Sequence, residues 1–235
     1  MTSKNSLLTE TRNLRKVYFR KSSPPIKALD GVNLKVFAGE FLALVGRSGS
    51  GKTTLLNLIG ALDRPTSGEV LFEGKSLGDF SNRDLALLRR EKIGFIFQTF
   101  NLLPSLTVLE NVESALVHLP MSKNQITKKV ATLLEFFDLT AKSSMLPLDL
   151  SVGQQQKVAI ARALVKNPVL ILADEPTGEM DPIAGREIVA KLVELNRKLK
   201  VTMIVASHGA FPYTQTDRTL FIKDGKLVSQ KEAGY

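Results

Sequence analysis

The stretch Gly46-Arg47-Ser48-Gly49-Ser50-Gly51-Lys52-Thr53 limits what this chain can fold into more than any other segment. Its glycines let successive backbone N–H groups point inward at phosphate oxygens, because no Cβ atom obstructs them. The apolar run Phe41–Val45 precedes it, and a helical pattern follows over about Lys52–Leu62. A strand, this loop and a helix in that order are typical of a phosphate-binding P-loop. A Gly-rich turn that only caps a helix is the weaker alternative.

Two further apolar runs have the character of buried strands, Val169–Ala173 and Val201–Ala206, and a helix is predicted between them. Asp181 suits the N-cap of that helix, and Pro182 suits its first turn. Its apolar stripe consists of Ile188, Leu192, Leu195 and Leu199. Strands that alternate with helices predict an α/β fold with a largely parallel sheet.

The middle and the beginning of the chain depart from this alternation. Helices punctuated by prolines are predicted at Thr107–Leu116, Ser122–Phe137 and Gln154–Lys166. Short strands that suit an antiparallel subsheet are predicted at Ser6–Val17, Gly31–Phe37 and Glu69–Glu73.

The expected architecture is therefore a P-loop NTPase core with a parallel sheet, an antiparallel β-subdomain and an inserted α-helical subdomain. Residues 1–235 are expected to form one ATPase domain. Within it, residues 1–97 and 158–235 make up the core with its β-subdomain, and residues 98–157 make up the helical subdomain.

Composition narrows the possible chemistry. The 235 residues include no Cys, which excludes disulfides and thiolate sites and suits a reducing cytoplasm. No apolar run approaches the roughly 20 residues of a transmembrane helix, so the chain is not expected to cross a membrane. The net charge of +9 leaves nucleic acid, anionic lipid headgroups and solvated Lys-rich faces open. Basic residues are spread along the chain without alternating aromatics, which disfavours nucleic acid.

Polar residues follow two predicted strands, at the edge where open parallel sheets bind ligands. Asp174 and Glu175 come directly after Val169–Ala173, and His208 comes after Ser207 at the end of the next strand. Asp174 is expected to hold Mg²⁺ through water, and Glu175 to act as general base on the attacking water. Taken alone, the acid pair would suit a helix cap, and a lone His a structural role. The phosphate loop favours catalysis, with His208 contacting the γ phosphate.

The expected cofactors are ATP and Mg²⁺. Lys52 should reach the β and γ phosphates, where it contributes to catalysis, and the Thr53 hydroxyl should coordinate the metal ion, which prefers oxygen ligands. The residues of this loop expected to bind nucleotide are Gly46, Arg47, Ser48, Gly49, Ser50, Gly51, Lys52, Thr53 and Thr54.

The segment Leu150–Lys157, LSVGQQQK, is followed by VAIARAL and closely resembles the signature motif of ABC ATPases with its helix. Ser151 and Gln154 also fit a capping box, and a helix N-terminus is itself an anion site, so both interpretations coincide. The resemblance covers nearly the whole chain. It implies an ATPase in which Ser151, Gly153 and Gln154 of one copy close over the γ phosphate held by the other copy.

Three further residues match the family's pattern. The resemblance implies that Tyr18 stacks on adenine and that Gln98 ligates Mg²⁺ at the junction with the helical lobe. It also implies that Asp181, in the loop Gly178–Asp181, lies at the dimer interface. Edge-strand packing is the alternative for Tyr18, and a surface loop position is the alternative for Gln98. The expected metal ligands are Thr53, Gln98 and Asp174.

Three stretches narrow the branch of the family: Ala61–Val70, Phe97–Pro104 and Leu106–Val112. They are similar to the branch that holds the lipoprotein-release ATPases, the macrolide and peptide exporter MacB and the cell-division ATPase FtsE. The chain departs from the family's usual pattern in having Val152 in place of the first signature Gly, Lys157 in place of Arg, and Gly209 in place of an acid.

The resemblance implies a transport-coupled ATPase that forms a homodimer on Mg-ATP and drives an integral membrane subunit docked near Gln98–Pro104. The cargo would be a lipoprotein, lipid, peptide or drug, and the chain would be peripheral on the cytoplasmic face of the cell (inner) membrane. An FtsE-like regulatory ATPase that signals without transport stays open. An ABC-type ATPase acting on nucleic acid is less favoured, because only a helical lobe separates Lys52 from Ser151, without a long coiled coil. No nucleic acid is expected as a partner.

Overall fold

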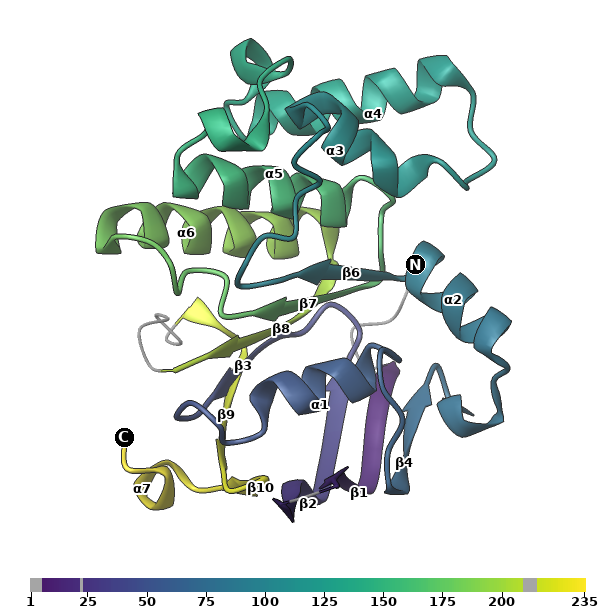
Figure 1. Cartoon of the computed structure of the whole chain (residues 1–235), viewed down its shortest axis with the longest axis vertical. Coiled ribbons are helices and arrows are strands. Elements are labelled where there is room, and N and C mark those ends of the chain that lie inside the picture. Colours follow the sequence, from purple (N-terminus) through teal and green to yellow (C-terminus); the bar gives the residue numbers. More distant parts are fainter. Residues whose placement is uncertain (1–5, 22, 209–214) are drawn as a thin grey trace.

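A computed structural model describes residues 6–21, 23–208 and 215–235, with two sheets, one helix between them and further helices on the outer face (Figure 1). In the described ranges the larger sheet has the strand order β10-β9-β3-β8-β7-β6. Its strands are β3 (Phe41–Val45), β6 (Ile93–Ile96), β7 (Leu170–Asp174), β8 (Thr202–Ser207), β9 (Arg218–Lys223) and β10 (Lys226–Val228). All neighbours are parallel except β9 and β10.

The smaller sheet is antiparallel, with the order β2-β1-β4-β5. Its strands are β1 (Leu7–Arg20), β2 (Ser23–Phe37), β4 (Ser67–Phe72) and β5 (Lys75–Ser76). The α/β class and the antiparallel subsheet predicted from the sequence are confirmed, although β1 and β2 are both longer than the runs that predicted them.

Helix α1 (Lys52–Ile59) fills the space between the two sheets (Figure 1). Leu55, Leu58 and Ile59 are each at most 1% exposed and belong to a core that also contains residues of β1, β2, β3, β7 and β8. Fully burying a Leu or Ile side chain stabilises a fold by about 1.5 to 3 kcal/mol. The helix that starts at the phosphate loop is therefore fixed from both sides.

The other helices cover the opposite face of the larger sheet or lie at its edge. They are α2 (Asn82–Glu91), α3 (Val108–Glu113), α4 (Lys123–Phe136), α5 (Val152–Leu164), α6 (Pro182–Leu199) and α7 (Gln230–Ala233). Helices α5 and α6 pack on the sheet, and α3 and α4 pack outside α5 (Figure 1). The four helices predicted downstream of residue 98 are present, and the first of them ends in a 3-10 turn at Ser114–Leu116.

Several features differ from the sequence prediction. In the apolar stripe predicted for α6, Ile188, Leu192 and Leu195 are buried, whereas Leu199 is 58% exposed. The buried part of the stripe stops at Leu195 because α6 ends at Leu199, and Lys200 turns the backbone away with a φ of +55°.

Strand β6 was not predicted, since its four residues include Gly94 and show no alternation of apolar and polar residues. A Cβ atom on Gly94 would lie 2.7 Å from the Ala163 carbonyl oxygen, so α5 packs directly on the backbone there.

None of the helices within the described ranges combines the length and the hydropathy needed to span a bilayer.

Lys166 generates a prediction about stability. Burial lowers the pKa of this side chain to about 8, and its ammonium group donates to the neutral Arg89 carbonyl oxygen at 2.7 Å. Since the folded pKa lies below the unfolded one, the cost of burying the charge is fully present below pH 8 and declines as the pH rises to about 10.5. We expect Lys166→Met to raise the free energy of unfolding at pH 7 by about 1 to 3 kcal/mol, and this gain to shrink by pH 10.

Urea denaturation of both proteins at pH 7 and pH 10 measures the effect. Lys75→Met, which changes an exposed residue of β5, is the matched control and should change stability little at either pH. A gain that does not depend on pH would show that Met packs better there, and that the charge is not the cause.

Candidate active site

The phosphate-binding loop connects β3 to α1 at the carboxyl end of the parallel strands. The Gly46 N–H donates to the Ser207 carbonyl oxygen at 3.1 Å, so the loop leaves the sheet beside the end of β8. A Cβ atom on Gly46 would lie 2.4 Å from the Ile222 carbonyl oxygen. Gly51, the N-cap of α1, has a φ of +110° that L-residues rarely adopt. The first and last glycines of the motif are therefore required by the fold itself.

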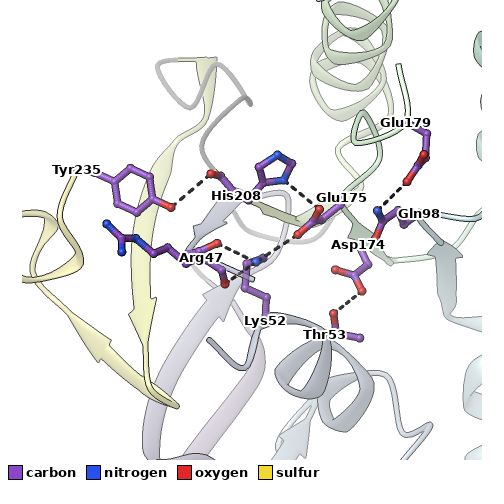
Figure 2. A network of polar contacts seen from close by, with 10 residues as sticks. Arg47, Lys52, Thr53, Gln98, Asp174, Glu175, Glu179, His208 and Tyr235 are labelled. Carbon is purple, nitrogen blue, oxygen red and sulfur yellow. Dashed lines mark hydrogen bonds and ion pairs between the residues drawn. The ribbon is translucent and has the colours of Figure 1, made fainter. Parts of the chain in front are cut away.

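Lys52 is buried, with only 4% of its side chain exposed. Its ammonium group donates to the carbonyl oxygens of Gly46 at 2.8 Å and Arg47 at 3.1 Å. It also lies 3.3 Å from Oε1 of Glu175, an ion pair that connects two loops at the sheet edge (Figure 2). The loop thus surrounds a cation that can bind an anion entering from the open side.

The carboxyl ends of the adjacent strands β7 and β8 bring Glu175 and His208 together (Figure 2). Nδ1 of His208 lies 3.0 Å from Oε2 of Glu175, and the imidazole is the donor because an ionised carboxylate only accepts. The Glu175 carboxylate is thus held by Lys52 through one oxygen and by His208 through the other. Gly209, which follows His208, lies outside the described residues.

The backbone of Glu175 is left-handed, with a φ of +46°. Its N–H still donates to the Ala206 carbonyl oxygen at 3.0 Å, and its carbonyl oxygen accepts from the Gly178 N–H at 3.0 Å. A left-handed conformation costs a residue with a Cβ atom on the order of 1 to 3 kcal/mol, and such strain is concentrated at functional sites. The turn points this carboxylate at Lys52 and His208.

The residues beside Glu175 fit a magnesium ion. Oδ2 of Asp174 accepts from the Thr53 hydroxyl at 2.7 Å, while Oδ1 is buried and has no hydrogen-bond partner. Burial raises the pKa of the Asp174 carboxyl, and the neighbouring Glu175 charge acts in the same direction. A buried carboxylate oxygen without a partner is costly, and a hard cation satisfies it.

The donor set also suits this ion. In the described part of the chain no cluster of three or more His, Cys, Asp or Glu residues forms a cage around a metal. Mg²⁺ typically takes one or two protein oxygens and completes its shell with phosphates and water. Asp174 and Thr53 would hold it at the edge of the phosphate loop.

Gln98 follows β6 and lies on the same side of the site as Asp174 (Figure 2). Its amide Nε2 donates to Oε1 of Glu179 at 2.9 Å, a contact that the sequence did not predict. Glu179 belongs to the loop Gly178–Asp181, and Asp181 caps α6 by accepting from the N–H groups of Ile183 and Ala184 at 2.9 and 3.0 Å. The predicted N-cap is confirmed.

The remaining residues of the phosphate loop differ in how exposed they are. Arg47, Ser48 and Gly49 are exposed, and Ser50 is buried with no hydrogen-bond partner for its hydroxyl. A nucleotide phosphate would supply an acceptor for that hydroxyl and for the exposed N–H groups. Thr54 is half-buried within the first turn of α1.

The signature segment forms the start of α5 and has the predicted capping box. Oγ of Ser151 accepts from the Gln154 N–H at 3.3 Å, and Oε1 of Gln154 accepts from the Ser151 N–H at 3.1 Å. Val152 is 41% exposed and Gly153 is half-buried. In the described residues no hydrogen bond or ion pair joins Ser151 or Gln154 to the phosphate loop of this copy.

Tyr235 was not predicted to contribute to the site. Its hydroxyl donates to the His208 carbonyl oxygen at 3.4 Å (Figure 2). Its ring packs on Phe221 of β9 with centroids 5.6 Å apart. The contact joins residues 27 positions apart, and no local pattern in the sequence could have revealed it.

Comparison with known proteins agrees with this geometry. Residues 29–178 match the family model described as ABC transporter. The lipoprotein-releasing system ATP-binding protein LolD 2 of Chlorobaculum tepidum is 40% identical over 231 residues, which cover 96% of this chain and 94% of that protein. The ABC transporter ATP-binding protein YvrO of Bacillus subtilis is 46% identical over 217 residues, 92% of this chain and 93% of that protein.

A fused relative differs in length. The pyoverdine export ATP-binding/permease protein PvdT of Pseudomonas fluorescens is 43% identical over 222 residues, 94% of this chain but 34% of that protein. This chain therefore spans about a third of the length of the PvdT relatives.

A solved dimeric ATP-binding cassette, in a post-hydrolysis state bound to ADP and Pi, superposes with a TM-score of 0.87 at 41% identity. The alignment covers 94% of this chain and 97% of that one. The match to a cassette caught after hydrolysis, together with the family model, supports ATP hydrolysis by this chain.

Lys52 generates the second prediction. We expect Lys52→Ala to weaken Mg-ATP binding about 30-fold or more, because removing one partner of a buried charge pair costs about 2 to 5 kcal/mol. Isothermal calorimetry measures the affinity, with the exposed Lys75→Ala as control. An unchanged ATP affinity in a folded Lys52→Ala protein would mean that the loop does not bind the phosphates.

Proposed function

The chain belongs to the ABC transporter family, and from that premise we propose that it is the motor subunit of a transporter. It closes as a homodimer on Mg-ATP, hydrolyses the nucleotide and drives a membrane partner that exports or extracts a lipoprotein, lipid, peptide or drug. The observation that carries the proposal is the position of Glu175 between Lys52 and His208 at the carboxyl edge of the sheet.

Each group in this cluster has a proposed chemical role. Lys52 binds the β and γ phosphates and stabilises the negative charge on them. The Glu175 carboxylate orients the attacking water and accepts its proton, while His208 contacts the γ phosphate and orients Glu175. Thr53 and Asp174, joined by Gln98 on closure, would hold a magnesium ion, which would neutralise charge on the phosphates.

Nucleotide binding also changes the partners of Glu175. In the present structure Lys52 is shared between two carbonyl oxygens and this carboxylate. A phosphate that attracts the Lys52 ammonium releases the Glu175 oxygen paired with it, and that oxygen becomes available to water. The proposed base is therefore activated by the arrival of the substrate.

The proposed dimer interface is supported by an exposed surface around the start of α5. Leu148 is 84% exposed, Ile183 is 66% exposed, and Val152, which follows the N-cap Ser151, is 41% exposed. Apolar side chains this exposed, beside free helix N–H groups, suit an interface that binds an anion and a second surface together. We propose that the second copy binds here and that Ser151, Gly153 and Gln154 meet its nucleotide.

The proposed docking site for a membrane subunit is the loop from Gln98 to Pro104. Phe100 and Asn101 have φ values of +59° and +48°, and their carbonyl oxygens accept from the Arg162 guanidinium of α5 at 2.7 and 2.6 Å. Leu103 is 44% exposed on this loop. An apolar residue on a loop held in one conformation is suited to receive an amphipathic helix.

The proposed subdomain division gives this loop a mechanical role. The helical subdomain at 98–157 and the core at 1–97 and 158–235 share α5, which runs unbroken from Val152 to Leu164. Arg162 therefore transmits a shift of the docking loop directly to the helix that begins at Ser151.

Location and cargo are also part of the proposal. We propose a peripheral position on the cytoplasmic face of the cell (inner) membrane. Similarity to LolD 2, named for a lipoprotein-releasing system, supports a lipoprotein cargo, whereas similarity to PvdT, named for pyoverdine export, supports an exported cargo. A regulatory ATPase that signals through a membrane subunit is the alternative. Substrate-stimulated ATPase activity of the chain, reconstituted in nanodiscs with a copurifying membrane protein, would favour the transporter.

Glu175→Gln tests the mechanism. We expect this variant to bind ATP normally and to hydrolyse it about 10²- to 10⁴-fold more slowly, because the general base is lost while the shape of the side chain is kept. The ATP-bound state should accumulate, and a monomeric chain should become a dimer with Mg-ATP. A phosphate-release assay measures the rate, and size-exclusion chromatography with light scattering measures the mass.

The control is Glu135→Gln, which changes an exposed acid of α4 and should alter neither measurement. Hydrolysis by Glu175→Gln at the wild-type rate would exclude Glu175 as the base. A variant that binds ATP but stays monomeric at high concentration would contradict a dimer formed without the membrane partner.

A further inference from the structure

Tyr18 lies near the end of β1, where this strand pairs with β2 and no longer with β4. Arg15 is the last residue of β1 that pairs with β4, and Tyr18 pairs only with Ile26 of β2. The register between β1 and β2 also shifts between Lys16 and Val17 and again after Tyr18. A two-stranded ribbon is only marginally stable alone, so a side chain on it needs another contact to hold its position.

Residues 63–66, which lie between α1 and the start of β4, supply that contact beside the end of β1. The Thr66 N–H donates to the Arg15 carbonyl oxygen at 2.9 Å, and the Val17 N–H donates to the Thr66 hydroxyl at 3.0 Å. The Lys16 ammonium group donates to the Arg64 carbonyl oxygen at 2.7 Å. These bonds fix the end of β1 against residues 63–66.

Asp63 is the centre of this contact. Its Oδ2 accepts from the Tyr18 hydroxyl at 3.0 Å, and its Oδ1 accepts from the Lys16 ammonium group and the Arg64 N–H, both at 2.7 Å. Lys16 and Tyr18 both donate to this one carboxylate, so their side chains lie on the same side of the strand. The ammonium group of Lys16 also lies 4.8 Å from the centroid of the Tyr18 ring, within cation–π range.

The charges in the cluster are balanced. Burial opposes ionisation of Asp63, but the hydrogen bonds from Lys16, Arg64 and Tyr18 outweigh it and hold the pKa of this carboxyl below its ordinary value. Asp63 is then an ionised acceptor at neutral pH, and hydrogen bonds to a charged acceptor are stronger than those between neutral groups. The side chain of Lys16 is 12% exposed, so its pairing with Asp63 is shielded from solvent.

Helix α1 connects this cluster to the phosphate loop. The N–H groups of Leu62 and Asp63 donate to the Asn57 carbonyl oxygen at 2.8 and 3.3 Å, so Asp63 is fixed to the last turns of α1. Lys52 is the first residue of the same helix, whose eight residues span roughly 12 Å. The position of the Tyr18 ring is thereby related to that of Lys52 through one rigid element.

From these contacts we infer that Asp63, with Lys16, is a positioning residue that holds the Tyr18 ring as a platform for the nucleotide base and sets its distance from the phosphate loop. The inference rests on the proposed function, because it needs Tyr18 to receive adenine. Lys16 covers one face of the ring, and the base stacks on the other face. A ring that is already ordered loses less entropy when the base binds, which raises affinity.

Equilibrium binding of Mg-ADP and of Mg-pyrophosphate, measured by calorimetry, tests the inference, since pyrophosphate offers two phosphates without a base. Tyr18→Ala should weaken ADP binding about 5- to 150-fold, the factor expected for one stacked base. Asp63→Ala and Tyr18→Phe should each weaken it about three- to tenfold. Pyrophosphate affinity should stay unchanged in all three variants.

Two further proteins complete the experiment. The double variant Tyr18→Ala/Asp63→Ala should bind ADP no more weakly than Tyr18→Ala, because Asp63 acts through the ring. Asp79→Ala, which changes an exposed acid of a nearby 3-10 turn, should bind both ligands like the wild type. Tyr18→Phe keeps the ring and removes the hydroxyl that contacts both Asp63 and Thr54, so it tests what the hydroxyl contacts contribute even if Asp63→Ala does not fold.

The outcomes separate the inference from the proposed function. If Tyr18→Ala weakens ADP binding while Asp63→Ala and Tyr18→Phe do not, the ring is a platform that Asp63 does not position. If Asp63→Ala weakens ADP and pyrophosphate binding equally, Asp63 acts on the phosphate loop and the inference is overturned. If Tyr18→Ala itself binds ADP normally, the proposed stacking of adenine on Tyr18 is wrong, and the inference falls with it.

Discussion

The Lys52 side chain is 4% exposed, and burying its charge costs several kcal/mol unless opposite charge and hydrogen-bond acceptors surround it. Its acceptors come from two places: the carbonyl oxygens of Gly46 and Arg47 in the loop after β3, and the carboxylate of Glu175 after β7. Because β8 lies between β3 and β7, the ion pair spans three strand ends. The site therefore depends on the order of strands in the parallel sheet, and any element that shifted one strand end would leave a buried charge without its partner.

Strain at the site follows from the same requirement. Glu175 has a left-handed backbone that holds its carboxylate beside Lys52. Phe100 and Asn101, in the loop after β6, are left-handed as well. Each costs on the order of 1 to 3 kcal/mol, which the surrounding contacts must offset. The Arg162 guanidinium offsets part of it, since its two hydrogen bonds reach both strained carbonyl oxygens. Both strained segments follow strands of the parallel sheet, β6 and β7, so the strain lies at the edge where the site is built.

The sequence predicts much of this fold because the decisive patterns are local. Phe41–Val45 is a continuous apolar run, so it is buried on both faces, and Ser151 and Asp181 are caps that bond within their own first turns. Short elements such as β6 escape prediction, since Gly94 is selected by the approach of α5 and not by strand propensity. The partners of Gln98 and Tyr18 escape it as well. Those bonds join residues that are adjacent only after the sheets and α1 have assembled.

The glycines of the phosphate loop and of the signature segment differ in what the packing of a single chain requires of them. At Gly46 a Cβ atom would lie 2.4 Å from a carbonyl oxygen, so the fold excludes any other residue. At Gly153 a Cβ atom would meet only the Ala184 Cβ, at 3.8 Å, which is ordinary contact within this copy. Val152 at 41% exposed and Leu148 at 84% exposed also contribute little to the core. The packing of one copy therefore accounts for the phosphate loop but not for the signature segment. The second copy proposed above, bringing a phosphate to that helix, would account for a small residue beside exposed apolar ones at a capped helix start.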